Sequence, residues 1–182
     1  MTKLHEGGSS SDNATAGCAA ALHRLNCSLD EIMASVSPSR RASVAAGAGV
    51  LRLGVPWTQG WAGLGHGTSR SLLHAVTAAT RTTGLHGTIA FGMLGAILGL
   101  PRDAVLDAYA YSTARGAVNA ATRLNLVGPQ QAVAIQAELA EVAIEVADLN
   151  LSLRLDEAAG VAPILDTIHC AHDVLELRLF RT

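Results

Sequence analysis

A double periodicity between Pro129 and Leu149 constrains the fold more than any other feature of the sequence. Apolar residues follow one another there at steps of four, three, four and three, and acidic residues at steps of three, four and three. Both patterns match the 3.6-residue turn of an α-helix, whereas a strand would alternate at every second residue. The stretch is predicted to be one helix with a buried apolar stripe (Ile135, Leu139, Val142, Val146, Leu149) and a parallel acidic stripe (Glu138, Glu141, Glu145, Asp148). The acidic stripe is either a solvated face or a docking face.

Helical patterns extend over most of the chain, and strand alternation does not appear. Only 3% of the residues are aromatic while 49% are apolar, so Ala, Leu and Val must form the core. We expect residues 1–14 to be a disordered segment and residues 15–182 to be one domain. Helices are predicted at about 15–25, 28–36, 38–53, 68–82, 85–99, 101–124, 129–149 and from 163 onward, with a Gly-rich loop at 54–67. The predicted fold class is all-α, a single helical bundle of about seven helices.

Three signals bear on the environment of the protein. The net charge of -2 carries no nucleic-acid signature, and the apolar run from Thr88 to Leu100 is shorter than the roughly 20 residues that span a membrane. The three cysteines do not form a disulfide framework, which favours a reducing compartment. No signal peptide pattern precedes the first helix. We therefore expect a cytoplasmic protein without nucleic-acid or membrane partners.

The charges are unevenly distributed along the chain. Residues 32–102 hold six Arg and no acidic residue, whereas residues 103–182 hold five Arg and eleven acids. This asymmetry either reflects helix faces that sort by sign or gives a dipole that orients docking partners.

The sequence offers little catalytic chemistry. It contains no GxSxG, no HExxH and no phosphate-binding GxxxxGK[ST], so no enzymatic activity and no cofactor is expected. His169, Cys170 and His172 are the one cluster of soft metal-ligand types, but a closed site needs further ligands. The cluster is either one core and one surface histidine on a helix, or a metal-carrying site.

The last residues of the chain, Leu175 to Thr182, alternate apolar and charged side chains. Chain ends are usually polar, so an apolar end must pack against its own core or in the pocket of a partner. Arg and Phe are common anchors at protein interfaces.

Four segments resemble the urease accessory protein F (UreF) family. Ala120 to Gly128 reads Ala-Ala-Thr-Arg-Leu-Asn-Leu-Val-Gly and is similar to the family pattern AAxRLxxxG in its plant-like, eukaryotic form. The end of the chain, from Pro163 through His172 to Thr182, resembles the family ending PLLD…HE…SRLF. Arg41-Ala42-Ser43 with Gly47 is similar to a family helix REAS…G…LL, and Gly84 to Gly92 to its H.PVAFG helix.

The resemblance implies a nickel-insertion chaperone without catalytic activity. Proteins of this family are all-helical, form homodimers, and bridge UreD (also called UreH) and the GTPase UreG while apo-urease matures. The matching positions imply partner contacts at Tyr111, Arg123, Gly128 and His172, and at Arg178, Leu179, Phe180 and Arg181 in the tail. The family's opening P-x-G-x-F-x-x-S-x-G-L-E motif has no counterpart here, so we expect a fragment, an incomplete gene product or a shortened paralogue.

Overall fold

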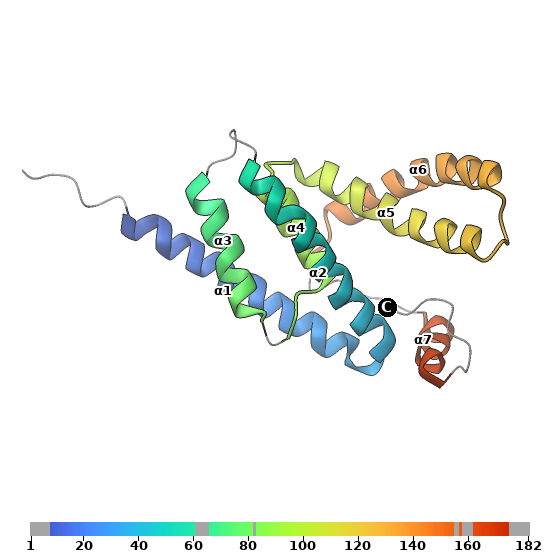
Figure 1. Ribbon diagram of the computed structural model, residues 1–182, viewed down its shortest axis with the longest axis horizontal. Coiled ribbons are helices and arrows are strands. Elements are labelled where there is room, and N and C mark those ends of the chain that lie inside the picture. Colours follow the sequence, from blue (N-terminus) through green and yellow to red (C-terminus); the bar gives the residue numbers. More distant parts are fainter. Residues whose placement is uncertain (1–7, 61–65, 82, 155–156, 158–161, 175–182) are drawn as a thin grey trace, which may run out of the picture. The chain divides into compact units, whose positions relative to one another are not determined.

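The computed structural model describes residues 8–60, 66–81, 83–154, 157 and 162–174, and all of their regular structure is helical. The α-helices are α1 (Gly8–Ile32), α2 (Ser37–Gly60), α3 (His66–Ala79), α4 (Gly87–Ile97), α5 (Arg102–Arg123), α6 (Pro129–Leu151) and α7 (Pro163–Ala171) (Figure 1). Short 3-10 helices cover Met33–Ser35 (η1) and His172–Val174 (η3). The predicted all-α fold with about seven helices is confirmed. The chain forms two compact units, residues 1–99 with 162–182, and residues 100–161.

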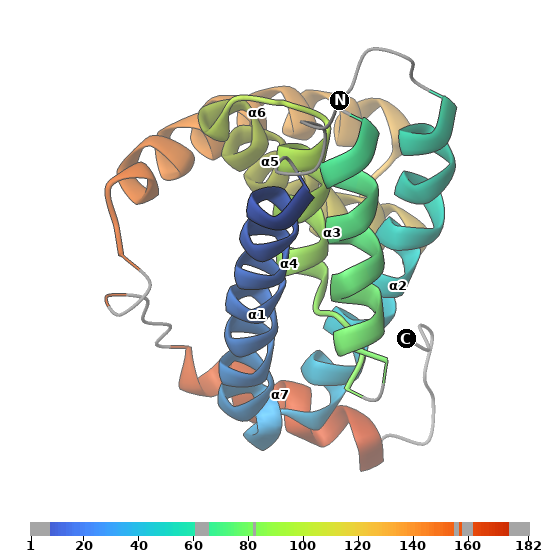
Figure 2. The ribbon, with the colours of Figure 1, turned by 90° about the vertical axis from the view of Figure 1, so that its left-hand side faces the viewer.

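The first unit is built on two helix pairs, α1 with α3 and α2 with α4 (Figure 2). Thr15, Ala19 and Asn26 of α1 are buried, and Leu22 packs against the core. Their spacing of four, three and four residues puts them on one face of α1. The core combines this face with residues of α3, α4 and the segment between them (Leu73, Val76, Leu85, Ala90, Met93, Ile97). The apolar run from Thr88 is thus a buried helix, as predicted.

The helix boundaries differ from the prediction in two places. A new helix is predicted from residue 28, where Ser28 and Glu31 have the spacing of a capping box, but α1 runs through both residues to Ile32 and Ser28 is exposed. Neither Gly nor Pro interrupts residues 18–27 before Ser28, and the buried face of α1 continues to Asn26, so the helix does not start anew at Ser28. The predicted loop at 54–67 is likewise partly helical, because α2 continues through Pro56 to Gly60.

In the second unit α5 and α6 form a helical hairpin, and here the predicted stripe on α6 is partly wrong. Val142, Val146 and Leu149 are exposed, and α6 instead buries three of its alanines (Ala132, Ala143, Ala147). Small side chains allow two helix backbones to approach closely, and the bulkier residues then remain outside the seam. The four acidic residues of the other stripe are all exposed, as a solvated or docking face requires.

Glycines in the left-handed region delimit α4. Gly84 and Gly99 have φ of 74° and 69°. A Cβ on Gly84 would lie 2.4 Å from Cγ1 of Val44, so space as well as backbone geometry requires glycine there. The chain can therefore turn sharply from α3 into α4.

Candidate functional site

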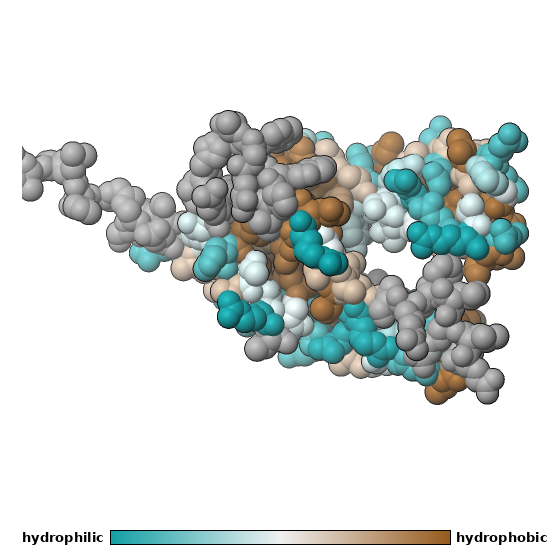
Figure 3. All heavy atoms as spheres, in the orientation of Figure 1, coloured by the Kyte–Doolittle hydropathy of each residue, from teal (hydrophilic) through white to brown (hydrophobic). Residues whose placement is uncertain are grey.

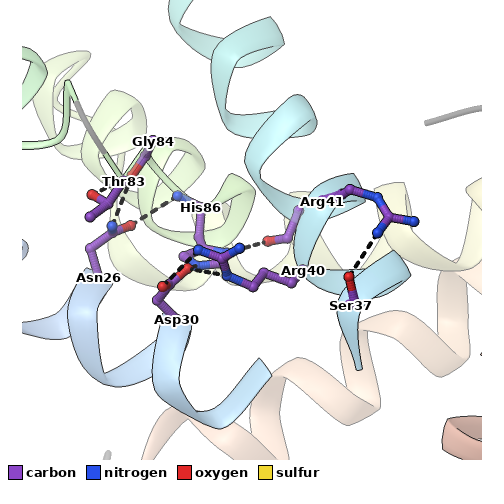
Figure 4. A network of polar contacts seen from close by, with 9 residues as sticks. Asn26, Asp30, Ser37, Arg40, Arg41, Thr83, Gly84 and His86 are labelled. Atoms are coloured by element: carbon purple, nitrogen blue, oxygen red, sulfur yellow. Dashed lines mark hydrogen bonds and ion pairs between the residues drawn. The ribbon is translucent and has the colours of Figure 1, made fainter. Parts of the chain in front are cut away.

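A partly buried polar network joins α1, α2 and the connection between α3 and α4 (Figure 4). Asn26 is fully buried on α1, and its side-chain amide satisfies two backbone groups of this connection. Its Nδ2 donates to the carbonyl of Gly84 at 2.9 Å, and its Oδ1 accepts from the backbone N–H of His86 at 2.9 Å. A buried backbone group without a partner is costly, so these two bonds determine where the connection lies on α1.

His86 is the centre of the network. Its side chain is fully buried, its Nε2 lies 3.2 Å from Oδ1 of Asp30, and its Nδ1 lies 3.0 Å from Oγ of Ser43. An ionised carboxylate only accepts hydrogen bonds, so we assign the ring proton to Nε2, which donates the hydrogen bond to Asp30. In a neutral imidazole Nδ1 is then an acceptor, and the Ser43 hydroxyl donates to it. The ring thereby links α1 to α2 through both of its nitrogens.

Asp30 also pairs with Arg40 at the start of α2. Nε and Nη2 of Arg40 donate to the two carboxylate oxygens at 2.7 and 2.9 Å, which is the bidentate geometry of a strong ion pair. The hydrogen bond from Arg40 lowers the pKa of Asp30, assisted by the bond from His86 and opposed by burial. Asp30 in turn raises the pKa of Arg40. The carboxylate is thus held ionised, the form that both donors require.

The network combines Ser, His and Asp side chains but lacks the access that nucleophilic catalysis needs. A catalytic imidazole exchanges protons with a bound substrate, whereas none of the His86 side chain is exposed. Ser43 is the seventh residue of α2, and its hydroxyl lies 3.0 Å from Nδ1 of the buried ring. These contacts give the network a structural role, because they hold α1, α2 and the connection between α3 and α4 together. We call it the His86 network (Asn26, Asp30, Arg40, Ser43, His86).

Gly47 allows α2 to approach the His86 network. A Cβ at this position would lie 1.8 Å from the carbonyl oxygen of Leu85 and 3.0 Å from the carbonyl carbon of His86. Ser43, Gly47, Gly84 and His86 all belong to segments that resemble family motifs, but no signal in the sequence pairs them. Ser43 and His86 are 43 positions apart and Asn26 and His86 are 60 apart, and no local pattern reports contacts of that range.

A second group of polar contacts attaches α7 and η3 to the end of η1 and the beginning of α2. Nδ1 of His169 lies 3.1 Å from Oγ of Ser39, and Sγ of Cys170 donates to the carbonyl of Ser35 at 3.4 Å. Arg41 pairs with Asp173 and also donates to Oγ of Ser37 at 2.7 Å. Most of these groups are exposed, so each pair contributes little to stability.

The metal-carrying alternative for His169, Cys170 and His172 is not supported. His169 contacts Ser39 and Cys170 contacts Ser35, so the two side chains bind different residues. Nδ1 of His172 is shielded from solvent and has no hydrogen-bond partner. Metal ligands must converge on one point. Within the described part of the chain, His, Cys, Asp and Glu nowhere form a group of three that could hold a metal ion.

The structure distributes the predicted partner-binding residues over both units. Tyr111 is half-buried on α5, Arg123 is the exposed last residue of α5, and exposed Gly128 is the N-cap of α6. His172 is half-buried in η3. The tail residues Arg178, Leu179, Phe180 and Arg181 lie outside the described residues. Partner binding at all these positions stays a prediction.

The segment similar to the AAxRLxxxG pattern forms the tip of the hairpin. Asn125 has a φ of 56°, its N–H donates to Thr122, and the N–H of Leu126 donates to Ala121 at 3.0 Å. This pattern is a Schellman motif, in which a left-handed residue satisfies the last carbonyls of a helix. Gly128 and Pro129 then start α6. The turn presents Leu126 to solvent with 73% of its surface exposed.

None of the helices in the described residues is long and apolar enough to cross a membrane, in agreement with the short apolar run in the sequence.

Comparisons with known proteins point to one family. The UreF family model matches residues 8–140. The chain is 29% identical over 155 residues to urease accessory protein F of Oryza sativa subsp. indica, covering 84% of this chain and 56% of the relative. It is 30% identical over 109 residues to urease accessory protein F of Arabidopsis thaliana, covering 60% and 45%.

A bacterial relative, urease accessory protein UreF of Bradyrhizobium sp. (strain ORS 278), is 28% identical over 94 residues, which cover 52% of this chain and 39% of the relative. No solved structure matches the chain significantly. The matched part of this chain spans about half the length of these curated relatives. Because the family match covers most of the described helices, including the whole His86 network and the hairpin tip, the chain belongs to the UreF family.

Proposed function

We propose that this protein is a non-catalytic accessory factor of urease maturation, which bridges UreD (UreH) and the GTPase UreG while nickel is inserted into apo-urease. The observation that carries the proposal is the family match over residues 8–140, together with relatives that are named urease accessory proteins. We further propose that it works in the cytoplasm as a homodimer.

The surface of the described residues supports a role in protein binding. Ile164, Leu165 and Ile168 of α7 are all more than half exposed, directly before the apolar and cationic tail. Leu126 adds an exposed apolar side chain at the hairpin tip, next to Arg123. Exposed apolar side chains beside arginines are typical of interfaces. The inaccessibility of His86 supports a function without catalysis.

We assign the partner contacts to the positions that match the family motifs. Tyr111, Arg123 and Gly128 serve the dimer and the GTPase, whereas His172, Arg178, Leu179, Phe180 and Arg181 serve UreD. In the tail Leu179 and Phe180 supply apolar area, and the two arginines supply hydrogen-bond donors.

Co-expression tests the bridging role. UreD, UreG and apo-urease of the source organism are produced with and without this chain, and complexes are separated by size exclusion. We expect UreG to co-elute with UreD only when the chain is present, and nickel-dependent urease activity to follow the same pattern. Co-elution that is independent of the chain would contradict the proposal.

Deletion of residues 178–182 tests the tail. We expect loss of co-purification with UreD and an unchanged far-UV circular dichroism spectrum, because single anchors of this kind contribute about 2 to 4 kcal/mol to an interface. Arg52→Ala is the control, since it removes an exposed arginine from α2. Undiminished binding by the truncated chain would refute the assignment of the tail.

Tyr111→Ala tests the second group of contacts. We expect weaker dimerisation in sedimentation velocity or weaker recruitment of UreG in pull-downs. Tyr109→Ala is a matched control, because Tyr109 is a half-buried tyrosine of the same helix. Equal behaviour of both variants and the wild type would remove Tyr111 from the proposed interface.

A further inference from the structure

The outer surface of α6 carries an apolar group that the hairpin does not use. Val142, Val146 and Leu149 are 51%, 46% and 68% exposed, although they recur at steps of four and three residues. This spacing places them on one side of the helix, beside the buried alanines. We call these three residues the apolar flank of α6. In the space-filling view, hydrophobic as well as hydrophilic residues reach the surface of the α5–α6 hairpin (Figure 3).

The acidic stripe lies next to the apolar flank. Glu138, Glu141, Glu145 and Asp148 are all exposed, and α6 contains no Lys, Arg or His. Counted at 3.6 residues per turn, Glu138 and Glu145 border the flank directly, whereas Glu141 and Asp148 lie further around the helix. The surface thus combines an apolar strip with a negative edge that α6 itself does not neutralise.

The charges decide which occupant fits this surface. An α6 helix of a second copy packed on the apolar flank would bring no Lys, Arg or His to neutralise the acidic edge. In an antiparallel two-fold arrangement the two acidic edges would also approach each other, and like charges at an interface are unfavourable. An amphipathic helix with Lys or Arg along one border would instead bury the flank and neutralise Glu138 and Glu145. Helix-in-groove recognition of this kind uses apolar anchors three and four residues apart.

We propose that the apolar flank of α6, with Glu138 and Glu145, docks a basic amphipathic helix of another protein. The inference rests on the proposed function in one respect, which is that the partner is sought among the proteins of urease maturation. It adds a binding surface whose residues differ from those of the tail and from the motif positions Tyr111, Arg123, Gly128 and His172. It also answers the question that the sequence left open, because the acidic stripe becomes part of a docking face.

Site-specific photocrosslinking tests the location of the surface. The full chain carries p-benzoylphenylalanine in place of Val146, or in place of exposed Ala137 as the control, and is irradiated in the presence of UreD and UreG. We expect position 146 to crosslink to a Lys- or Arg-rich helical segment of one of these proteins, and position 137 to do so far less. Crosslinks from position 146 to a second copy of this chain would overturn the proposal in favour of self-association.

Charge reversal tests the chemistry with a matched pair of variants. Glu138→Arg with Glu145→Arg should raise the Kd for the crosslinked partner at least about tenfold, whereas Glu141→Arg with Asp148→Arg should have a much smaller effect. Both pairs change the charge of α6 equally. One outcome is that the complex forms through the tail while position 146 gives no crosslink to a partner and Glu138→Arg with Glu145→Arg leaves the Kd unchanged. The α6 proposal then fails and the proposed function stands. If no complex forms, both fail.

Discussion

Replacing Gly47 by alanine should destabilise the first unit, although alanine is the better helix former. The added Cβ would start 1.8 Å from the carbonyl oxygen of Leu85, and real Cβ contacts are essentially never shorter than 3.0 Å. Either α2 or the segment from Leu85 to His86 must therefore move by about 1.2 Å, the difference between these two distances. This contact is with backbone, so rotation of a side chain cannot relieve it.

The expected loss of stability can be estimated from three contributions. Overpacking of this kind costs about 1–3 kcal/mol. Displacement of His86 also weakens its bond with Asn26, for about 1 kcal/mol more. The higher helix propensity of alanine returns about 1 kcal/mol. Gly47→Ala should therefore lower the free energy of unfolding by about 1–3 kcal/mol.

Gly49→Ala is the matched control on the same helix. A Cβ at Gly49 meets no atom within 4 Å, so only the propensity gain remains and the variant should be more stable by about 1 kcal/mol. Urea unfolding followed by tryptophan fluorescence measures both, because Trp57 lies in α2 and Trp61 directly follows it. With a slope of about 1–3 kcal/mol per molar urea, the midpoint should fall by roughly 0.3–3 M for Gly47→Ala and rise by roughly 0.3–1 M for Gly49→Ala. Equal shifts of the same sign would refute the close approach of α2 to Leu85.

Two further predictions concern Asp30 and Asn125. The pKa of Asp30 is lowered in the folded protein, so its stabilising contribution is complete above the unfolded value of 3.8 and is lost as the pH falls through the folded value. Asp30→Asn should therefore be less stable than the wild type at pH 7 and lose less stability between pH 5 and pH 2, as measured by urea midpoints at each pH; parallel pH profiles would contradict this account. Asn125 has a φ of 56°, so Asn125→Gly should stabilise the hairpin by up to about 1 kcal/mol and Asn125→Val should destabilise it by about 1–2 kcal/mol. Thermal unfolding by circular dichroism checks the order Gly, Asn, Val, and any other order would argue against the Schellman turn.

The helical class and most helix positions could be predicted because they depend on local signals. A periodicity of 3.6 residues, a proline at the start of α6 and a glycine at each end of α4 act within one or two turns of chain. The family motifs added the likeness to UreF but not the contacts among their residues. Local signals were misleading at Ser28, which could cap a new helix, and at Pro56, which could end one. The chain remains helical through both residues.

Tertiary packing determined which side chains are buried and which residues meet. The sequence marks Val142, Val146 and Leu149 as the apolar side of α6, but the hairpin buries Ala132, Ala143 and Ala147, because closely approaching backbones leave room only for small side chains. No local signal in the sequence predicts that His86 is buried or which residues contact it. It becomes a buried link only because Asp30 and Ser43, 56 and 43 positions away, are brought to its two nitrogens by the packing of α1 and α2. Contacts between distant positions depend on the whole arrangement of helices, and a linear pattern carries no record of them.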